Sequence, residues 1–185
     1  MVLTKTPICN YGEKANSFKL KGIDGKLHEL EDHIGKNGIL IMFICNHCQY
    51  VKAVVKDIVN DSKMLASEGV KVIAINSNDT NDYPEDSFEN MILFAKKNNF
   101  EFPYLIDETQ EVAKKYVAVC KPDFFGFNKK LELQYRGRIK ELRDLKQVNK
   151  SESDLLKAMR LVIKTGNGPK EQIPSMGCNI KWTKE

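Results

Sequence analysis

The sequence has no apolar run long enough to cross a membrane. Its longest such run, residues 39–45, is far shorter than the roughly 20 residues that a membrane-spanning helix needs. The N-terminus also lacks the basic start and the continuous apolar stretch of a secretory signal. We therefore expect a cytoplasmic protein with no membrane partner.

Concentrated positive charge is missing as well. The chain has 29 Lys and Arg against 25 Asp and Glu, spread along all 185 residues, for a formal net charge of +4. A nucleic-acid-binding surface needs clustered basic residues to neutralise a row of phosphates. We expect no nucleic-acid partner.

Cysteines are few, and their number is odd. Five cysteines without a secretory signal argue against a disulfide-stapled extracellular scaffold and for thiols kept in a reducing compartment. Cys45 and Cys48 form a single Cys-x-x-Cys pair, whereas Cys9 is expected to be incidental. Cysteine in this chain therefore points to redox chemistry or to metal binding.

The composition is that of one globular domain, with 42% hydrophobic and 29% charged residues. We expect this domain to span residues 1–168, including an N-terminal hairpin. The tail, residues 169–185, has no periodicity and is expected to pack on the domain.

The first half of the chain predicts alternating strands and helices. Alternating apolar residues flank Asp24-Gly25, which predicts a hairpin. Residues 38–44 are apolar at every position, as in a strand covered on both faces. An amphipathic helix follows Cys48 and ends before Gly69, and residues 70–76 supply the next strand, parallel to the first.

The second half adds further elements. Asp86 and Glu89 read as a capping box that opens a helix, and Asp107 with Gln110 can cap another through residue 116. Pro103 favours an edge position for the strand at residues 102–106. A hairpin of residues 124–127 and 131–135 and a helix over 151–164 complete the domain.

The cysteine pair stands between a buried strand and a helix. A helix N-terminus presents unpaired amides and partial positive charge, which favour thiolate over thiol. We expect Cys45 to project at the loop as the more acidic thiol, and His47 to lower the thiol pKa further. Thiolate stabilisation favours the reduced form. The couple should therefore be more oxidising than that of thioredoxin, whose reduction potential is about −270 mV.

A structural zinc site is the alternative for the same pair. Cys120, Cys178 or His47 can then supply the remaining ligands. A second Cys-x-x-Cys is missing, so we predict no bound metal and no cofactor.

Several stretches in this order resemble the thioredoxin superfamily over about residues 14–165. They are most similar to bacterial thioredoxin-like proteins of the alkyl hydroperoxide reductase and thiol-specific antioxidant (redoxin) group. The stretches that carry the resemblance are residues 43–52, 74–79, 83–88, 107–113, 122–125 and 174–182. The resemblance implies an α/β fold, a thioredoxin-like three-layer sandwich in which helices cover both faces of a mixed central sheet.

The resemblance also implies a cis peptide between Lys121 and Pro122, opposite the active cysteines. Such a bond exposes the preceding backbone for strand-like pairing with a substrate. Cys120 would then lie near Cys45 as a third reactive thiol, or be a buried and inert cysteine. Cys178 in the tail is a further candidate for a resolving thiol.

One departure weakens a peroxidase interpretation. Peroxiredoxins carry Thr-x-x-Cys, whose hydroxyl orients the peroxide, whereas Met42 stands three residues before Cys45 here. Arg136 and Arg138 can stabilise a thiolate, but solvated surface charge is the favoured interpretation for both.

The sequence thus predicts a thiol-disulfide oxidoreductase. Cys45 is the expected nucleophile and Cys48 the resolving thiol, with Asn46, His47, Pro122 and Cys120 in supporting roles. Its partners would be a disulfide-bearing protein or small molecule, or a peroxide, and a reducing dithiol. A thiol-dependent antioxidant peroxidase and a non-catalytic zinc-bound or structural binding module remain the alternatives.

Overall fold

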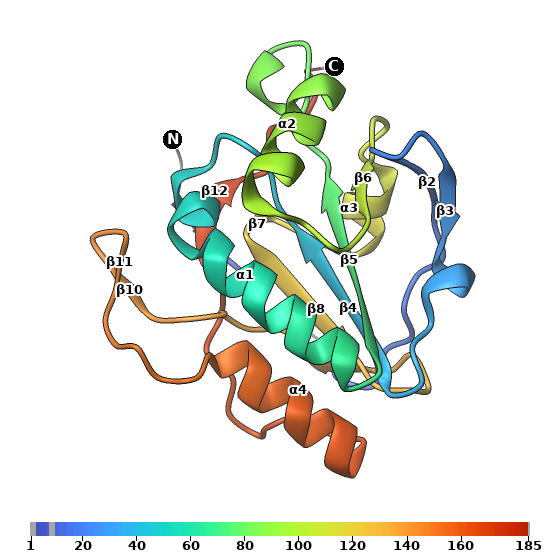
Figure 1. Cartoon of the computed structure of the whole chain (residues 1–185), viewed down its shortest axis with the longest axis vertical. Helices are drawn as coiled ribbons and strands as arrows, with labels where there is room; N and C mark the ends of the chain where they lie inside the picture. Colours follow the sequence, from blue (N-terminus) through green and yellow to red (C-terminus); the bar gives the residue numbers. More distant parts are fainter. Residues whose placement is uncertain (1–2, 8–9, 185) are drawn as a thin grey trace.

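A seven-stranded mixed sheet forms the centre of the computed structural model, which describes residues 3–7 and 10–184 (Figure 1). Strand β4 (Gly38–Phe43) is buried at every position. It pairs in parallel with β5 (Val70–Asn76) and antiparallel with β8 (Asp123–Phe127). The predicted strand covered on both faces is confirmed.

The remaining strands extend this sheet in the order β3-β2-β6-β5-β4-β8-β9. Strands β2 (Lys19–Gly22) and β3 (Leu27–Glu29) form the predicted N-terminal hairpin at one edge. At the other edge, β9 (Leu133–Tyr135) pairs with β8, as predicted.

The edge position predicted from Pro103 is wrong. Strand β6 (Tyr104–Ile106) lies inside the sheet, between β5 and β2. Pro103 immediately precedes β6, and its carbonyl accepts a hydrogen bond from the amide of Ala74 at 2.9 Å. The proline therefore starts the strand without removing a donor from the ladder.

Helices cover both faces of the sheet. One apolar core joins the sheet to α1 (Gln49–Ser67), α2 (Phe88–Asn98) and α4 (Asp154–Thr165). The other joins the opposite face to α3 (Glu111–Lys115) and to the 3-10 turn η1 (Leu30–His33). The predicted three-layer sandwich is confirmed (Figure 1).

The predicted capping box of α2 is wrong. A second 3-10 turn, η2 (Pro84–Asp86), precedes the helix, and Ser87 is its N-cap, accepting the amide of Asn90 at 3.4 Å. Asp86 is instead buried and accepts hydrogen bonds from the cysteine loop. The prediction for α3 is confirmed for Asp107, whose carboxylate accepts the amide of Ala113 at 2.9 Å, but not for Gln110, which is the N-cap residue and makes no side-chain cap bond.

A small second sheet joins both ends of the chain to the domain. Strand β12 (Met176–Asn179) lies between β1 (Leu3–Lys5) and β7 (Cys120–Lys121) and is antiparallel to both. A short hairpin of β10 (Leu142–Arg143) and β11 (Lys146–Gln147) extends from the body (Figure 1). The C-terminal segment thus reaches the strand that precedes Pro122.

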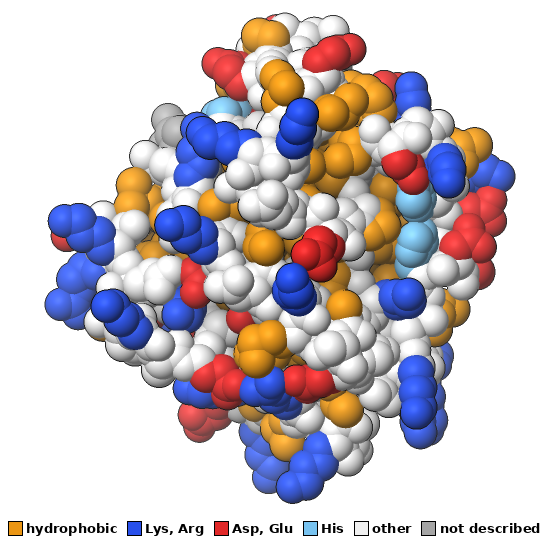
Figure 2. All heavy atoms as spheres, in the orientation of Figure 1, with side chains coloured by type: hydrophobic (Ala, Val, Ile, Leu, Met, Phe, Trp, Pro, Cys, Tyr) orange, Lys and Arg blue, Asp and Glu red, His pale blue; other side chains and the backbone are white. Residues whose placement is uncertain are grey.

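The charged surface is mixed. Figure 2 shows Lys and Arg side chains interspersed with Asp and Glu over the face that carries α1 and α4. Among the described residues, no helix is both long and apolar enough to cross a membrane.

Candidate active site

The two cysteines of the motif lie at the carboxyl end of β4. Cys45 follows the strand closely, and Cys48 is the N-cap residue of α1. Both have an exposed fraction of 0%. The prediction that Cys45 projects at a loop is therefore wrong, because the surrounding residues cover this edge of the sheet.

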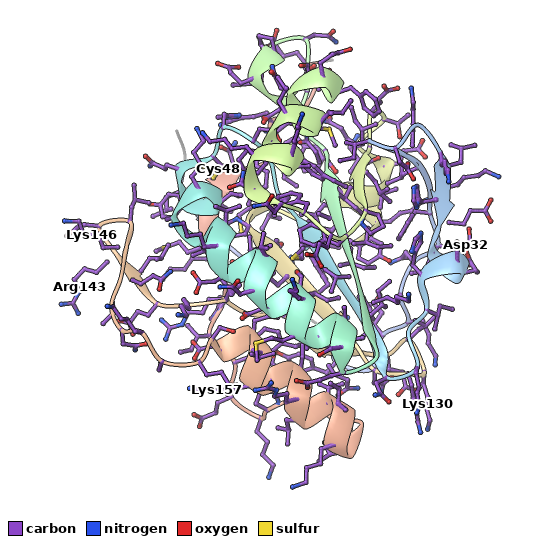
Figure 3. The ribbon with its side chains drawn as sticks, viewed as in Figure 1. Asp32, Cys48, Lys130, Arg143, Lys146 and Lys157 are labelled. Atoms are coloured by element: carbon purple, nitrogen blue, oxygen red, sulfur yellow. The ribbon has the colours of Figure 1, made fainter. Side chains whose placement is uncertain are left out.

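Cys48 has two close partners outside the motif. Its Sγ lies 2.8 Å from the Sγ of Cys178 and 3.2 Å from the carbonyl oxygen of Lys121, to which Cys48 donates when it is protonated. Figure 3 shows Cys48 at the start of α1, next to β12. The C-terminal strand therefore brings a third thiol to the motif, and Cys178 is buried there.

The acidity of the two motif thiols is opposite to the prediction. A hydrogen bond with the Cys45 thiol lowers the pKa of Cys48 to about 5, and Cys178 and the backbone amide of Val51 in α1 assist. Burial raises the pKa of Cys45 well above its ordinary value. Cys48 is the thiolate because it stands at the helix N-terminus between two thiol donors.

A buried lysine lies beside the thiols. The Lys121 side chain is 1% exposed, and its Nζ donates a hydrogen bond to Oδ1 of Asn78. Burial lowers the pKa of Lys121, while the neighbouring Cys45, Asp86 and Cys48 oppose that shift. The ammonium thus supplies positive charge where thiolate forms.

Asp86 organises the loop between the cysteines. Its Oδ1 accepts the backbone amides of Asn46 at 2.8 Å and His47 at 3.2 Å. Its Oδ2 contacts Nδ1 of His47 and accepts from Nδ2 of Asn78, both at 2.6 Å. Burial alone would raise the pKa of Asp86, but the hydrogen bonds from His47 and Asn78 hold it below its ordinary value.

The two residues between the cysteines are fixed from several sides. The His47 ring stacks on Tyr83, with ring centroids 5.8 Å apart and planes 5° apart. Asn46 donates to the carbonyl of Glu85 at 3.1 Å, and its Oδ1 accepts the hydroxyl of Tyr104 at 3.0 Å. A groove of about 570 Å³, lined in part by Asn46 and His47, opens between α1 and α2.

The predicted cis peptide between Lys121 and Pro122 is confirmed. Cys120 is buried and directs its Sγ to the carbonyl of Pro122 at 3.6 Å. Burial raises the pKa of the Cys120 thiol. Of the two interpretations left open for Cys120, the geometry favours a buried and inert cysteine. Cys9 lies outside the described residues.

Sequence reasoning missed three polar residues of the site, Asn78, Asp86 and Lys121. A signal for Asn78 was present, because the carboxyl ends of the parallel strands β4 and β5 share one edge and Asn78 follows β5 closely. Asp86 was assigned to a helix cap. Lys121 had no pattern that separated it from the other lysines.

The expected solvated arginines differ from each other. Arg136 is 5% exposed and pairs with the fully buried Asp123 at 2.9 Å, so its prediction as surface charge is wrong. The guanidinium also lies 4.4 Å from the centroid of the Phe125 ring. Arg138 is partly exposed and pairs with Asp154 at 2.7 Å.

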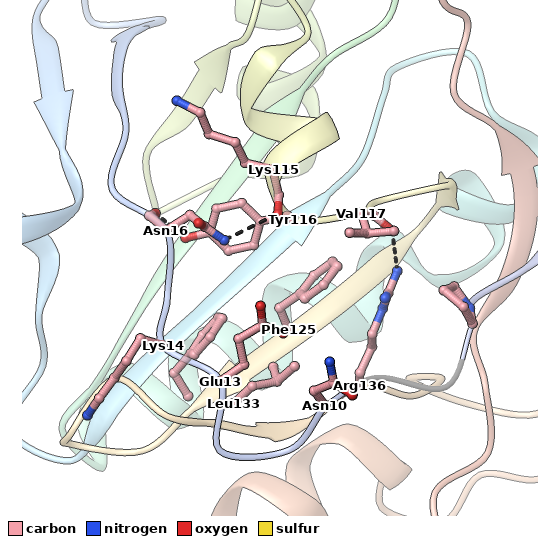
Figure 4. A pocket seen from close by; sticks show the side chains of 12 residues that line it. Asn10, Glu13, Lys14, Asn16, Lys115, Tyr116, Val117, Phe125, Leu133 and Arg136 are labelled. Atoms are coloured by element: carbon pink, nitrogen blue, oxygen red, sulfur yellow. Dashed lines mark hydrogen bonds between the residues drawn. The ribbon is translucent and has the colours of Figure 1, made fainter.

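Arg136 also lines a cavity of about 200 Å³ (Figure 4). The cavity is floored by Tyr116, Phe125 and Leu133, which belong to the apolar core on the α3 face of the sheet. The motif cysteines belong to the core on the other face. The cavity is therefore separate from the cysteine site.

Three side chains of the site could together hold a metal ion. Sγ of Cys45, a ring nitrogen of His47 and a carboxylate oxygen of Asp86 lie within 4.8 Å of one another. Thiolate, imidazole and carboxylate are all zinc ligands. His47 and Asp86 already satisfy each other through their 2.6 Å contact, which a metal would have to replace.

Comparisons with known proteins identify the family of the chain. Residues 11–139 match the model of the AhpC/TSA family. The chain is 27% identical over 129 residues to the thiol-disulfide oxidoreductase ResA of Bacillus thuringiensis, a match that covers 68% of each chain. Other ResA proteins match over 61% to 64% of their length.

Solved structures support the same fold. An uncharacterised conserved protein from Geobacillus kaustophilus is 39% identical, with a TM-score of 0.90 over 100% of this chain and 98% of the other. The thioredoxin domain of a Bacteroides vulgatus thiol-disulfide oxidoreductase is 14% identical, with a TM-score of 0.59 over 74% and 91%, and shares the fold. The chain belongs to the AhpC/TSA family of the thioredoxin superfamily.

Proposed function

We propose that the chain is a thiol-disulfide oxidoreductase in which Cys45 and Cys48 cycle between dithiol and disulfide. The observation that carries the proposal is the position of the two buried cysteines, with Cys48 as the N-cap residue of α1 and hydrogen-bonded to the Cys45 thiol, where the pKa of Cys48 is lowered. A thiolate next to a thiol is the arrangement that disulfide exchange needs.

The proposed cycle begins with the proton that the two thiols share. When this proton moves from Cys45 to Cys48, the Cys45 thiolate attacks one sulfur of a substrate disulfide. A mixed disulfide forms, and the other substrate sulfur leaves as thiolate. That thiolate takes up the proton of Cys48, and the Cys48 thiolate then attacks Sγ of Cys45. The bond between Cys45 and the substrate breaks, and the second substrate sulfur leaves as thiolate. The pair ends as a disulfide, and the substrate has gained two electrons.

The surrounding residues have distinct roles in this proposal. Lys121 supplies positive charge that favours thiolate at either sulfur, since it lowers the pKa of Cys45 against burial. Asp86 holds the backbone of Asn46 and His47 in place, and His47 faces the groove between α1 and α2. Pro122 follows the Lys121 carbonyl, which accepts a hydrogen bond from Cys48 when the proton is on Cys48.

The partners follow from the direction of the cycle. The oxidant is a disulfide of a protein or small molecule, and a reducing dithiol restores the pair. A pair that is reduced at rest suits a reducing compartment, so we place the chain in the cytoplasm.

Peroxide reduction has less support. Met42 is fully buried in the core and has no hydroxyl to orient a peroxide. Arg136 is held by Asp123 and the carbonyl of Val117, so it does not serve the cysteine site.

The test is to measure insulin disulfide reduction and peroxide consumption side by side. Wild type, Cys45→Ser and Cys48→Ser are compared with Cys120→Ser as the matched buried-thiol control. We expect insulin reduction to fall at least about 100-fold in the two motif variants, because each loses a reacting sulfur. Cys120→Ser should retain it.

The remaining outcomes separate the alternatives. Peroxide consumption without insulin reduction would replace the proposal with a peroxidase. Activity in neither assay, together with one equivalent of zinc by metal analysis, would support a binding module in which Cys45, His47 and Asp86 hold the ion.

A further inference from the structure

The C-terminal strand occupies the backbone edge that precedes Pro122. In β12, Cys178 pairs with Lys121 and Asn179 pairs with Cys120, in antiparallel register. Peptides bind exposed strands of this kind by adding a further strand through main-chain hydrogen bonds. Here a segment of the chain itself takes the place of such a peptide.

The fit between this strand and the site is close. A Cβ atom at Gly177 would lie 2.0 Å from the carbonyl oxygen of Lys121, so only glycine allows the approach. Ser175 fixes the start of the segment by donating from Oγ to the carbonyl of Pro122 at 2.6 Å. This register brings Sγ of Cys178 to 2.8 Å from Sγ of Cys48.

Cys48 is thus the middle thiol of three. It forms hydrogen bonds with the thiols of both Cys45 and Cys178. Cys120 sits on the neighbouring strand, but its Sγ points to the carbonyl of Pro122. The fourth described cysteine therefore provides a buried control that lacks the contact.

We propose that Cys178 is a third redox thiol, which exchanges with Cys48 and turns the motif disulfide into a Cys48–Cys178 disulfide. The inference rests on the proposed function, which supplies the Cys45–Cys48 disulfide. Cys178 attacks Sγ of Cys48, the Cys48–Cys178 bond forms, and the Cys45–Cys48 bond breaks. The proton of Cys178 passes to Cys45. One disulfide replaces another, so the step needs no oxidant.

This exchange replaces the disulfide within the motif by one between Cys48 and the C-terminal strand. Cys45 returns to the thiol form, while the disulfide joins α1 to β12. A separate groove of about 220 Å³, lined in part by Tyr50, Pro122 and Met176, lies along that strand. Reduction of the Cys48–Cys178 disulfide by a dithiol then restores both thiols.

The test maps disulfides in the full-length protein. Reduced wild type, Cys45→Ser, Cys48→Ser, Cys178→Ser and Cys120→Ser are oxidised with diamide, alkylated in acid, digested with trypsin and read by mass spectrometry. Lysines bound a peptide of residues 37–52 that holds both motif cysteines and a peptide of residues 171–181 that holds Cys178. A link between the two peptides in Cys45→Ser can therefore come from Cys48 alone.

We expect Cys45→Ser to lose two titratable thiols and to yield the linked peptides, whereas Cys48→Ser yields none and Cys120→Ser matches wild type. Gly177→Val, which pushes β12 away from Lys121, should slow formation of the link in the Cys45→Ser background at least about tenfold, because orientation is lost. The proposal is overturned if Cys45→Ser keeps its thiols or links Cys48 to another cysteine.

The Cys178→Ser variant separates failure of the third thiol from failure of the proposed function. Cys178→Ser that still forms the Cys45–Cys48 disulfide shows that the proposed function stands, whatever happens to the third thiol. If Cys178→Ser forms no intramolecular disulfide, the proposed Cys45–Cys48 couple is contradicted, and the proposed role of Cys178 is contradicted with it.

Discussion

Asp86 and Asp123 both have fully buried side chains, but they lie in different regions and have different partners. Asp86 accepts from two backbone amides of the cysteine loop and from His47 and Asn78, and its pKa is lowered. Asp123 pairs with Arg136, yet burial raises its pKa to about 6. The first carboxylate organises a reactive loop, while the second holds β8 to the chain that follows β9.

The largest expected effect concerns the second carboxylate. Arg136→Met should lower the free energy of unfolding by about 3 kcal/mol or more, because it leaves the buried Asp123 without its charged partner. Chemical denaturation measures this change. Insulin reduction per folded molecule should stay at the wild-type value, and a loss there would show that the two regions are coupled.

Asp86→Asn should produce the opposite pattern. Hydrogen bonds to a charged group are worth about 1.5–3 kcal/mol, so we expect insulin reduction to fall about tenfold or more as the cysteine loop loses its anchor. The matched control is Asp123→Asn, whose effect should be on stability. Equal activity losses in both variants would contradict the contrast between the two carboxylates.

The pH dependence of stability should report the Cys48 thiolate. The pKa of Cys48 is about 5 in the folded protein, whereas an unfolded cysteine titrates near about 8.5. Between these values the unfolded chain binds more protons, so Cys48 stabilises the reduced protein increasingly as pH rises. This contribution is lost as pH falls through about 5.

The measurement is thermal unfolding of reduced wild type and Cys48→Ala across this range. The difference between them should grow with pH, while Cys120→Ala runs parallel to wild type because the pKa of Cys120 is raised. A stability difference between wild type and Cys48→Ala that does not change with pH would show that Cys48 is not a thiolate in this range.

Two tyrosine hydroxyls give the smallest contrast. Tyr104 donates to Oδ1 of Asn46 in the motif at 3.0 Å, and Tyr116 donates to the carbonyl of Asn16 on the α3 face at 2.6 Å. Each Tyr→Phe change should cost about 1 kcal/mol of stability, the typical value of one hydrogen bond. Only Tyr104→Phe should also slow insulin reduction. Equal rates in the two variants would show that Asn46 needs no anchoring.

Much of the fold could be predicted from the sequence, because its signals are local. The apolar run of β4, the Asp-Gly turn of the first hairpin and the spacing of α1 each depend on neighbouring residues. The edge position predicted from Pro103 was wrong because a proline before a strand and a proline within an edge strand look alike in sequence.

The motif could be located from the sequence, but its acidity could not. Helix position favours thiolate at either cysteine. The pKa of Cys48 is lowered first by its hydrogen bond with Cys45 and then by Cys178, which lies 130 residues from Cys48. Lys121 and Asp86 likewise reach the thiols through tertiary packing. Asp86 also fits a capping pattern, so local rules assigned it to the wrong partner.

In the proposed function, Cys45 and Cys48 form a reversible two-electron couple in which a stabilised thiolate favours the reduced state. The most direct measurement is a redox titration in glutathione buffers, with the Cys45–Cys48 disulfide quantified by mass spectrometry in Cys178→Ser. We predict a midpoint potential above the value of about −270 mV found for thioredoxin. A lower potential, or no reversible disulfide between these cysteines, would contradict the account.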